Sequence, residues 1–284
     1  MAADGKQILV TGPTSGIGLA LVHELAAAGA TLVLGCRDAA KGEALAGELN
    51  RRGPGTASVL LVDTSSQQSI RDCAAAYRRQ HGRLDVLVNN AGAAHGERLL
   101  SPDGIELTFA ANVIGYWLLA QELQDVLRAS APARVVNVAS KFASELDLDD
   151  LQFENRPYDG LRAYAQSKAC NRLLTWALAR RLDGTGVTAN AYAPGFVAGT
   201  GLSRDLLPEV REIYKHRPGR TFAEGADTAV WLATSPDLDG VNGRFFMDRQ
   251  EIPCELRHVM AEERLWKTCE ALTQQAQPQP QGAP

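Results

Sequence analysis

A chain of 284 residues is long enough for one large α/β domain or two small ones, each with a sizeable core. Its hydrophobic fraction of 45% and charged fraction of 22% are typical of a soluble globular protein. The net charge of −4 favours neither nucleic acid nor an anionic membrane as a partner. The five cysteines are scattered and contain no C-x-x-C pair, which favours a reducing compartment.

The sequence pattern predicts neither a targeting segment nor a membrane span. The first residues lead directly into a strand pattern, so we expect no signal peptide. Residues 184–203 carry no charge, but their five glycines and one proline argue against a membrane helix. We therefore expect a cytoplasmic protein without a membrane span.

The chain begins with a strand, a glycine-rich turn and a helix. Residues 8–10 form a continuous apolar run, as in a parallel strand covered on both faces. Gly12, Gly16 and Gly18 permit a tight turn, and a helix from about residue 17 directs its first N–H groups into that turn. This pattern predicts a phosphate site; the alternative is an ordinary strand-to-helix turn. The spacing G-x-x-x-G-x-G differs from the general G-x-G-x-x-G fingerprint.

Apolar strands and helical patterns alternate along the rest of the chain, which predicts βαβ units. The further strands are expected at residues 31–35, 58–62, 84–88, 134–139, 187–193 and about 243–247. The helices are expected at about 39–50, after 65, at 103–121 and on to 128, at 161–182, 204–215, 223–233 and 256–272. The pattern predicts an α/β fold: a single doubly wound (Rossmann) domain over residues 1–273, with a central parallel sheet of about seven strands flanked by helices.

Polar residues mark the ends of two of these helices and of the chain. Asp38 is expected to cap the second helix. Thr64 and Ser65 each precede a glutamine by three residues, which predicts a capping box at the third helix. The Gln- and Pro-rich tail, residues 274–284, is low in complexity and is expected to be disordered.

The chemically informative stretches fall at one edge of the predicted sheet. A doubly wound sheet binds its ligand across the carboxyl ends of the strands. The stretches at such ends are residues 11–18, Cys36 with Arg37, Asp63, residues 89–92, Ser140 and residues 194–200. Their clustering is stronger evidence for a site than any one of them.

Tyr164 and Lys168 lie four residues apart in a predicted helix and so share one face. A phenol has a pKa of about 10, and a neighbouring cation lowers it toward neutrality. Tyr164 would then protonate a carbonyl oxygen, or accept the proton in the reverse direction. Ser140, at a strand end, would hydrogen-bond the substrate oxygen; the alternative is a polar strand end.

Taken together, these motifs resemble the short-chain dehydrogenase/reductase family. The stretches that carry the resemblance are T-G-x-x-x-G-I-G (11–18), N-N-A-G (89–92), Asn112, Ser140, Y-x-x-x-K (164–168) and P-G (194–195). The resemblance extends from about residue 6 to residue 272. Residues 146–174, 194–202, 243–248 and 261–273 look like the branch that contains retinol dehydrogenases, WW-domain oxidoreductases and protochlorophyllide reductases.

The resemblance implies catalytic roles. Tyr164 would be the general acid/base, Lys168 its electrostatic partner and a ribose ligand, and Ser140 the donor to the substrate oxygen. Asn112 would hold a water that relays protons to Lys168. Without the family, Asn112 is equally well a satisfied polar residue inside a helix.

The resemblance also implies a cofactor site. The residues implied are Gly12, Ser15, Gly16, Ile17 and Gly18 at the phosphates, Asp63 at the adenine, Asn90 at the ribose, and Pro194, Gly195, Val197 and Thr200 at the nicotinamide. Asp63 is otherwise a helix-capping carboxylate, Asn90 a turn residue, and the Pro-Gly pair a plain turn.

The residues after the second strand bear on the choice of cofactor. NAD-specific family members place an acid here for the ribose hydroxyls, whereas this chain has Cys36 and then Arg37. A guanidinium pairs with a 2′-phosphate, so NADP(H) is the expected cofactor. The alternative is that Arg37 is a solvated turn residue.

Two further expectations concern the substrate side. The substrate pocket is expected to be apolar and to be bounded by Phe142, Phe196, Leu202, Leu206 and Leu207. Residues 199–219 would form a mobile lid over it. Each of the five pocket residues could instead belong to the hydrophobic core. Ser140 and Tyr164 are 24 positions apart, and the acidic insertion between them (145–150) is compatible with a monomer as well as a homodimer. The five histidines, His95 included, show no metal-ligand spacing.

The expected activity is an NADP(H)-dependent oxidoreductase that acts on a carbonyl, a secondary alcohol or a primary alcohol of an apolar small molecule. One alternative is a catalytically idle NADP-sensing or scaffold protein on the same fold. Another is a carbon–carbon double-bond reductase of the protochlorophyllide reductase type.

Overall fold

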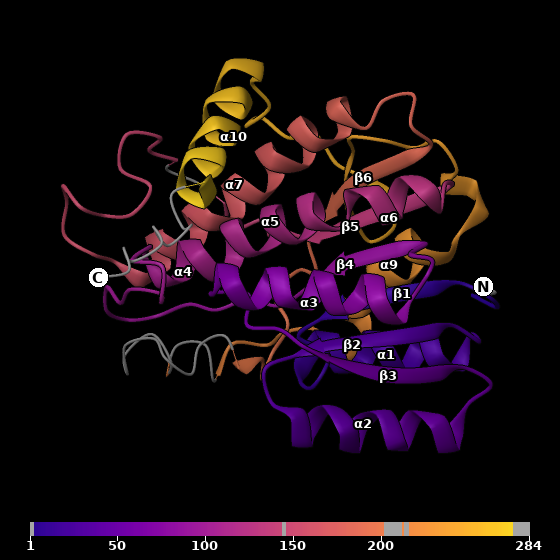
Figure 1. Ribbon diagram of the computed structural model, residues 1–284. Helices are drawn as coiled ribbons and strands as arrows, with labels where there is room; N and C mark the ends of the chain where they lie inside the picture. Colours follow the sequence, from indigo (N-terminus) through magenta and orange to yellow (C-terminus); the bar gives the residue numbers. More distant parts are fainter. Residues whose placement is uncertain (1–2, 144–145, 202–211, 213–215, 275–284) are drawn as a thin grey trace, which may run out of the picture.

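The computed structural model describes residues 3–143, 146–201, 212 and 216–274 (Figure 1). They form one eight-stranded sheet in the order β3-β2-β1-β4-β5-β6-β7-β8. The strands are β1 (Gln7–Thr11), β2 (Thr31–Cys36), β3 (Thr56–Leu61), β4 (Val86–Asn89), β5 (Ala133–Val138), β6 (Val187–Tyr192), β7 (Phe245–Met247) and β8 (Gln250–Glu251). All neighbouring pairs are parallel except β7 and β8. The predicted doubly wound sheet is therefore confirmed.

The helices form a layer on each face of the sheet (Figure 1). They are α1 (Gly16–Ala27), α2 (Ala39–Arg52), α3 (Gln67–Gln80), α4 (Leu107–Phe109), α5 (Gly115–Glu122), α6 (Gln124–Ala129), α7 (Gly160–Arg181), α9 (Phe222–Thr234) and α10 (Val259–Gln274). Along β1, Ile8 and Val10 pack with α1, α2 and α9, whereas Leu9 packs with α3, α5 and α7. Both faces are thus apolar, which explains the unbroken hydrophobic run of the strand.

Three local predictions differ from the structure. The third helix is capped by Ser66, whose side chain accepts from the Ser69 N–H at 3.3 Å, and not by Thr64 or Ser65. The antiparallel β8 was missed because it has only two exposed residues. The helix expected from residue 103 begins at Leu107, since Gly104 has φ +74° and turns the chain before Glu106 caps α4.

Other expectations have a mixed outcome. Asp38 caps α2 as predicted, accepting from the Lys41 N–H at 3.1 Å. The helix predicted at 204–215 lies almost wholly outside the described residues, and so does nearly all of the tail. Within the described part of the chain, every helix is too short or too polar to cross a membrane.

The C-terminal helix α10 covers α5 and α7 (Figure 1). Trp266 meets Trp117 of α5 edge-on, with ring centroids 5.4 Å apart. Glu263 pairs with Arg181 of α7 at 2.6 Å, and this hydrogen bond and one from Arg180 lower the pKa of Glu263 to about 2. The outer face of these two helices is therefore covered by the chain itself.

A chain of buried side-chain hydrogen bonds ties β4 and β5 to α7. The Asn89 amide donates to the Asn137 Oδ1 at 2.9 Å, and the Asn137 amide donates to the Thr175 Oγ1 at 2.9 Å. Asn137 is therefore the central link between the middle of the sheet and the helix that carries the site.

Removal of this link tests its contribution to stability. We expect Asn137→Ala to lower the free energy of unfolding by about 2–4 kcal/mol, because two buried partners lose their hydrogen bonds. Asn155→Ala, at an exposed asparagine of the loop before α7, should cost less than about 0.5 kcal/mol. Urea unfolding measures both; equal losses in the two variants would contradict this role of Asn137.

Candidate active site

The glycine turn after β1 brings two backbone segments unusually close. Gly12 and Gly16 have φ of +65° and +56°, conformations that favour glycine. A Cβ on Gly18 would collide with the carbonyl oxygen of Gly12 and the side-chain amide of Asn90. Ser15 precedes α1 with an exposed side chain that makes no capping hydrogen bond. The first N–H groups of α1 therefore open into the turn, as a phosphate site requires.

Asn90 and Thr11 join the turn to the next strand. The Asn90 amide donates to the carbonyl oxygens of Thr11 at 2.9 Å and Gly12 at 3.1 Å. The buried Thr11 hydroxyl in turn accepts from the N–H groups of Asn90 at 2.9 Å and Ala91 at 3.0 Å. Asn90 thus joins the ends of β1 and β4, and its contact with a ribose stays a prediction. Ile17 of α1 is partly buried against α9.

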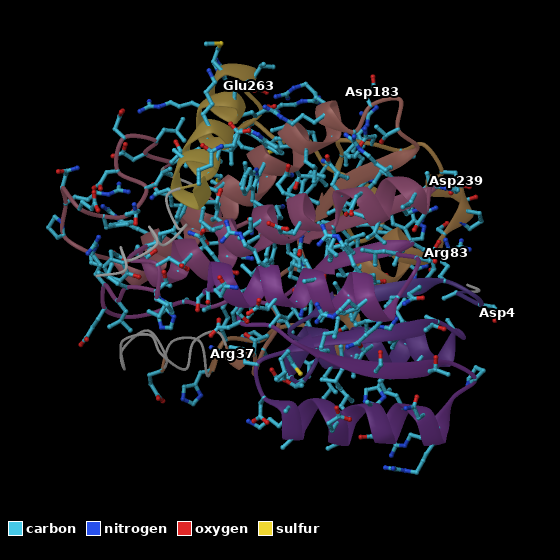
Figure 2. All side chains as sticks on the ribbon, in the orientation of Figure 1. Asp4, Arg37, Arg83, Asp183, Asp239 and Glu263 are labelled. Atoms are coloured by element: carbon cyan, nitrogen blue, oxygen red, sulfur yellow. The ribbon has the colours of Figure 1, made fainter. Side chains whose placement is uncertain are left out.

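The end of β2 presents a cation rather than a carboxylate. Arg37 is exposed at this end of the strand (Figure 2). Asp38 is engaged by its own helix: Lys41 approaches its carboxylate with Nζ at 3.0 Å, and the Lys41 N–H is the main cause that lowers the pKa of Asp38. Asp63, just after β3, accepts from the Ser65 hydroxyl at 2.7 Å.

Helix α7 positions the tyrosine and the lysine. Asp159 caps it by accepting from the N–H groups of Leu161 and Arg162. Tyr164 is partly exposed, whereas Lys168 is only 3% exposed and donates from Nζ to the Val138 carbonyl oxygen at 2.8 Å. The Lys168 Nζ lies 5.8 Å from the centre of the Tyr164 ring. Burial lowers the pKa of Lys168 to about 7.

Ser140 lies two residues beyond the end of β5, near this lysine. Its Oγ accepts from the Phe142 N–H at 3.0 Å, which leaves the hydroxyl proton available to a further acceptor. The Ser140 carbonyl oxygen accepts from the buried guanidinium of Arg172. Arg172 was not predicted from the sequence, although its position four residues after Lys168 places it on the same helix face.

Asn112 lies in a π-helical segment, Ala110–Ile114, between α4 and α5. Its Oδ1 accepts from the Ala93 N–H at 2.8 Å, and its amide donates to the Ala93 carbonyl oxygen and the Ser167 Oγ, both at 2.9 Å. Both amide donors are satisfied, so a single lone pair of Oδ1 remains for a water. The relay role of Asn112 stays a prediction. π-Helical segments occur often at functional sites.

Gly92 shows that Asn112 and Lys168 face the same space. A Cβ on Gly92 would lie 3.6 Å from the Asn112 Oδ1 and 3.8 Å from the Lys168 Nζ. The absence of a side chain at this position therefore keeps the approach to both groups open.

The loop after β6 carries the residues predicted at the nicotinamide. Pro194, Gly195 and Thr200 are partly buried, and Val197 is buried. Gly195 has φ +76°, and a Cβ there would lie 2.7 Å from the Arg220 Nε. The positive φ is the reason for glycine here, because the flexible Arg220 side chain could move away from a Cβ.

The predicted substrate pocket is only partly described. Leu202, Leu206 and Leu207 lie outside the described residues, as does most of the predicted lid. Phe142 is 49% exposed, and Phe196 is partly buried, with the Arg217 guanidinium 4.4 Å above its ring. In the described ranges, no three side chains of His, Cys, Asp or Glu gather where a metal ion could bind.

Comparisons with known proteins match most of the chain. The family model described as short chain dehydrogenase matches residues 6–210. The chain is 38% identical to mouse Retinol dehydrogenase 14 over 289 residues, covering 94% of this chain and 86% of that protein. It is 37% identical to human Retinol dehydrogenase 12 over 276 residues, covering 94% and 86%.

Solved structures show the same fold. A protein from Mycobacterium Paratuberculosis superposes with a TM-score of 0.78 at 29% identity, covering 96% of this chain and 95% of that one. The Pseudomonas aeruginosa RhlG/NADP active-site complex superposes with a TM-score of 0.67 at 29% identity, covering 86% and 95%.

The buried ammonium group predicts a pH dependence of stability. The pKa of Lys168 falls from an ordinary 10.5 to about 7 in the folded chain. Between these values the unfolded chain binds more protons, so stability rises with pH. Between pH 7.5 and 9.5, we expect the free energy of unfolding of the wild type to rise, relative to that of Lys168→Met, by up to about 1.4 kcal/mol per pH unit.

Urea unfolding at each pH measures this difference. A difference between the wild type and Lys168→Met that stays constant across this pH range would contradict the lowered pKa of Lys168.

Proposed function

The chain belongs to the short-chain dehydrogenase family and is an NAD(P)-dependent oxidoreductase, and on that premise we propose that it uses NADP(H) to interconvert a carbonyl and an alcohol on an apolar small molecule. One observation carries the proposal. Tyr164 and Lys168 share one face of α7, and both Lys168 and Arg172 connect that helix to the strand end that carries Ser140.

The residues present fit a dinucleotide. The glycine turn, with its close approach at Gly18 and the open N-terminus of α1, suits the diphosphate. Asp63, Asn90 and Lys168 would hold the adenosine and ribose groups, and residues 194–200 would hold the nicotinamide. When bound, the nicotinamide supplies or accepts the hydride.

The proton chemistry belongs to side chains of this protein. In reduction, the Tyr164 hydroxyl donates its proton to the carbonyl oxygen, and in oxidation the phenolate takes the proton back. The Ser140 hydroxyl, oriented by the Phe142 N–H, donates a hydrogen bond to the same oxygen as charge develops. The Lys168 ammonium favours the phenolate form of Tyr164. A water on Asn112 would return protons through Lys168.

The preference for NADP(H) rests on charge. Arg37 is the exposed side chain at the end of β2, and the carboxylate of Asp38 is held by the first turn of α2. A guanidinium binds a 2′-phosphate with two parallel hydrogen bonds. The structurally similar Pseudomonas aeruginosa RhlG is a complex with NADP, which supports this choice.

An apolar substrate is supported by the names of the relatives. Two of them are named retinol dehydrogenases, and retinol is an apolar alcohol. A catalytically idle scaffold is disfavoured because Tyr164, Lys168 and Ser140 are all present. A cytoplasmic location and a monomeric or homodimeric state stay predictions.

The tyrosine is tested with a panel of aldehydes, ketones and enones, read as NADPH consumption. We expect Tyr164→Phe to lower kcat at least about 100-fold, because the proton donor is lost. Tyr158→Phe is the matched control: the Tyr158 hydroxyl bonds Glu106 at 2.9 Å, so its loss should leave kcat within about twofold. Full activity of Tyr164→Phe would remove the tyrosine from the mechanism. Turnover of the enone double bond alone would favour a carbon–carbon reductase.

The cofactor preference is tested at Arg37. We expect Arg37→Ala to raise the KM for NADPH by about 10-fold or more and to leave the KM for NADH nearly unchanged, since only NADPH carries the 2′-phosphate. Arg52→Ala, at an exposed arginine at the far end of α2, should change neither value. Equal effects of Arg37→Ala on the two cofactors would refute the assignment.

A further inference from the structure

Lys168 is a buried cation with few partners of its own. The residue is 3% exposed, and its ammonium group has three donors. In the part of the chain that the structure describes, its one hydrogen bond to a protein group is the bond to the Val138 carbonyl oxygen. No carboxylate in the described part of the chain lies within ion-pairing distance. Because a buried charge is costly, a nearby group that attracts the ammonium would favour its charged form.

The side chain of Tyr116 provides that group. The Lys168 Nζ lies 5.2 Å above the centre of the Tyr116 ring, closer than its 5.8 Å to the Tyr164 ring. Tyr116 is only 3% exposed, so the contact is desolvated. An ammonium group within about 6 Å of a ring centroid is attracted by the negative face of the ring, most strongly where water is excluded.

The other groups around Lys168 do not replace this ring. Tyr164 comes from its own helix, the Val138 carbonyl from β5, and Asn112 and Gly92 from the two segments in front of it. Arg172, one turn further along α7, is a like charge. Tyr116 is therefore the closest aromatic face to the ammonium group and is not a member of the catalytic set.

The Tyr116 hydroxyl is not the part that acts. It is buried, and no hydrogen-bond partner for it lies among the residues that the structure describes. Tyr116 also lines a small cavity between α5, α7 and α10, whose other walls include Trp117, Asn171 and Trp266. The contact with Lys168 is thus made by the ring face, and the orphan hydroxyl is a separate feature.

We propose that Tyr116 is a positioning residue whose ring face stabilises the charged form of Lys168 and holds its ammonium group against the end of β5. The inference deepens the proposed function, on which it rests for the role of Lys168 toward Tyr164. Burial pushes Lys168 toward the neutral form, and the ring opposes it. Tyr116 lies four residues after Asn112, so both side chains approach α7 from the same side of their helix.

A series of substitutions at position 116 tests this role, because it keeps an aromatic ring in place and changes the charge on the ring face. Tyr116→Phe removes only the hydroxyl, and fluorinated phenylalanines placed at the same position progressively weaken and then reverse the negative ring face. The Lys168 pKa is read from the pH titration of its ¹³Cε resonance, which Lys168→Met assigns. We expect Tyr116→Phe to change that pKa by less than about 0.3 units, and pentafluorophenylalanine to lower it by about one unit.

Two comparisons make the result decisive. Pentafluorophenylalanine in place of Phe153, whose ring faces Arg156, should leave the Lys168 titration unchanged. If the Lys168 pKa is the same across the Tyr116 series, the proposal is overturned. Tyr116→Leu, if it folds, should lower the pKa as the fluorinated ring does.

The readout is independent of turnover. If the wild type reduces no carbonyl with NADPH, the proposed function fails while the titration still reports the contact between Tyr116 and Lys168. The other outcome is a wild type that is active while the acidic and basic pKa values of its pH–rate profile do not move with fluorination. In that case the ring has no part in positioning, and the oxidoreductase assignment stands.

Discussion

The hydrogen bond from the Lys168 Nζ to the Val138 carbonyl oxygen is the contact on which the site depends. It anchors α7 to the last residue of β5, and it thereby holds the helix that carries Tyr164 close to the turn that carries Ser140. The ammonium group that makes this contact is buried, and its burial lowers the pKa of Lys168 to about 7. The Tyr116 ring and the open side of Gly92 lie around that group, so the surroundings of one buried cation organise the catalytic end of the sheet.

A second constraint acts at the other end of the candidate cofactor site. There the chain is held by close backbone approach rather than by charge: Gly18 packs on Gly12, and Asn90 bonds the backbone of both Thr11 and Gly12. Such contacts exclude a side chain at Gly18, and the first N–H groups of α1 are donors that the helix itself does not satisfy. The phosphate end of the site is thus held by close backbone contacts, whereas the catalytic end depends on the protonation state of the buried Lys168.

The sequence predicted a large part of this arrangement. The order of apolar strands implied the sheet, and the i, i+4 spacing placed Tyr164 and Lys168 on one helix face. It did not predict the Ser66 cap, the late start of the helix at Leu107 or the short antiparallel β8. The two helix starts depend on local turns, such as the one at Gly104, where several starting points for a helix are nearly equal in energy. The two residues of β8 are too few and too exposed to give a strand pattern.

What the sequence determined by itself was the chemistry and its order along the chain: glycines after the first strand, a cation after the second, and then a serine, a tyrosine and a lysine at positions 140, 164 and 168. Periodicity is a local property, so it could be read without a structure. Only the tertiary structure decided that Tyr116 and Arg172 stand beside Lys168 and Ser140, and that α10 covers α5 and α7. These contacts join segments far apart in the chain, and their burial and distance follow from packing that no local pattern specifies.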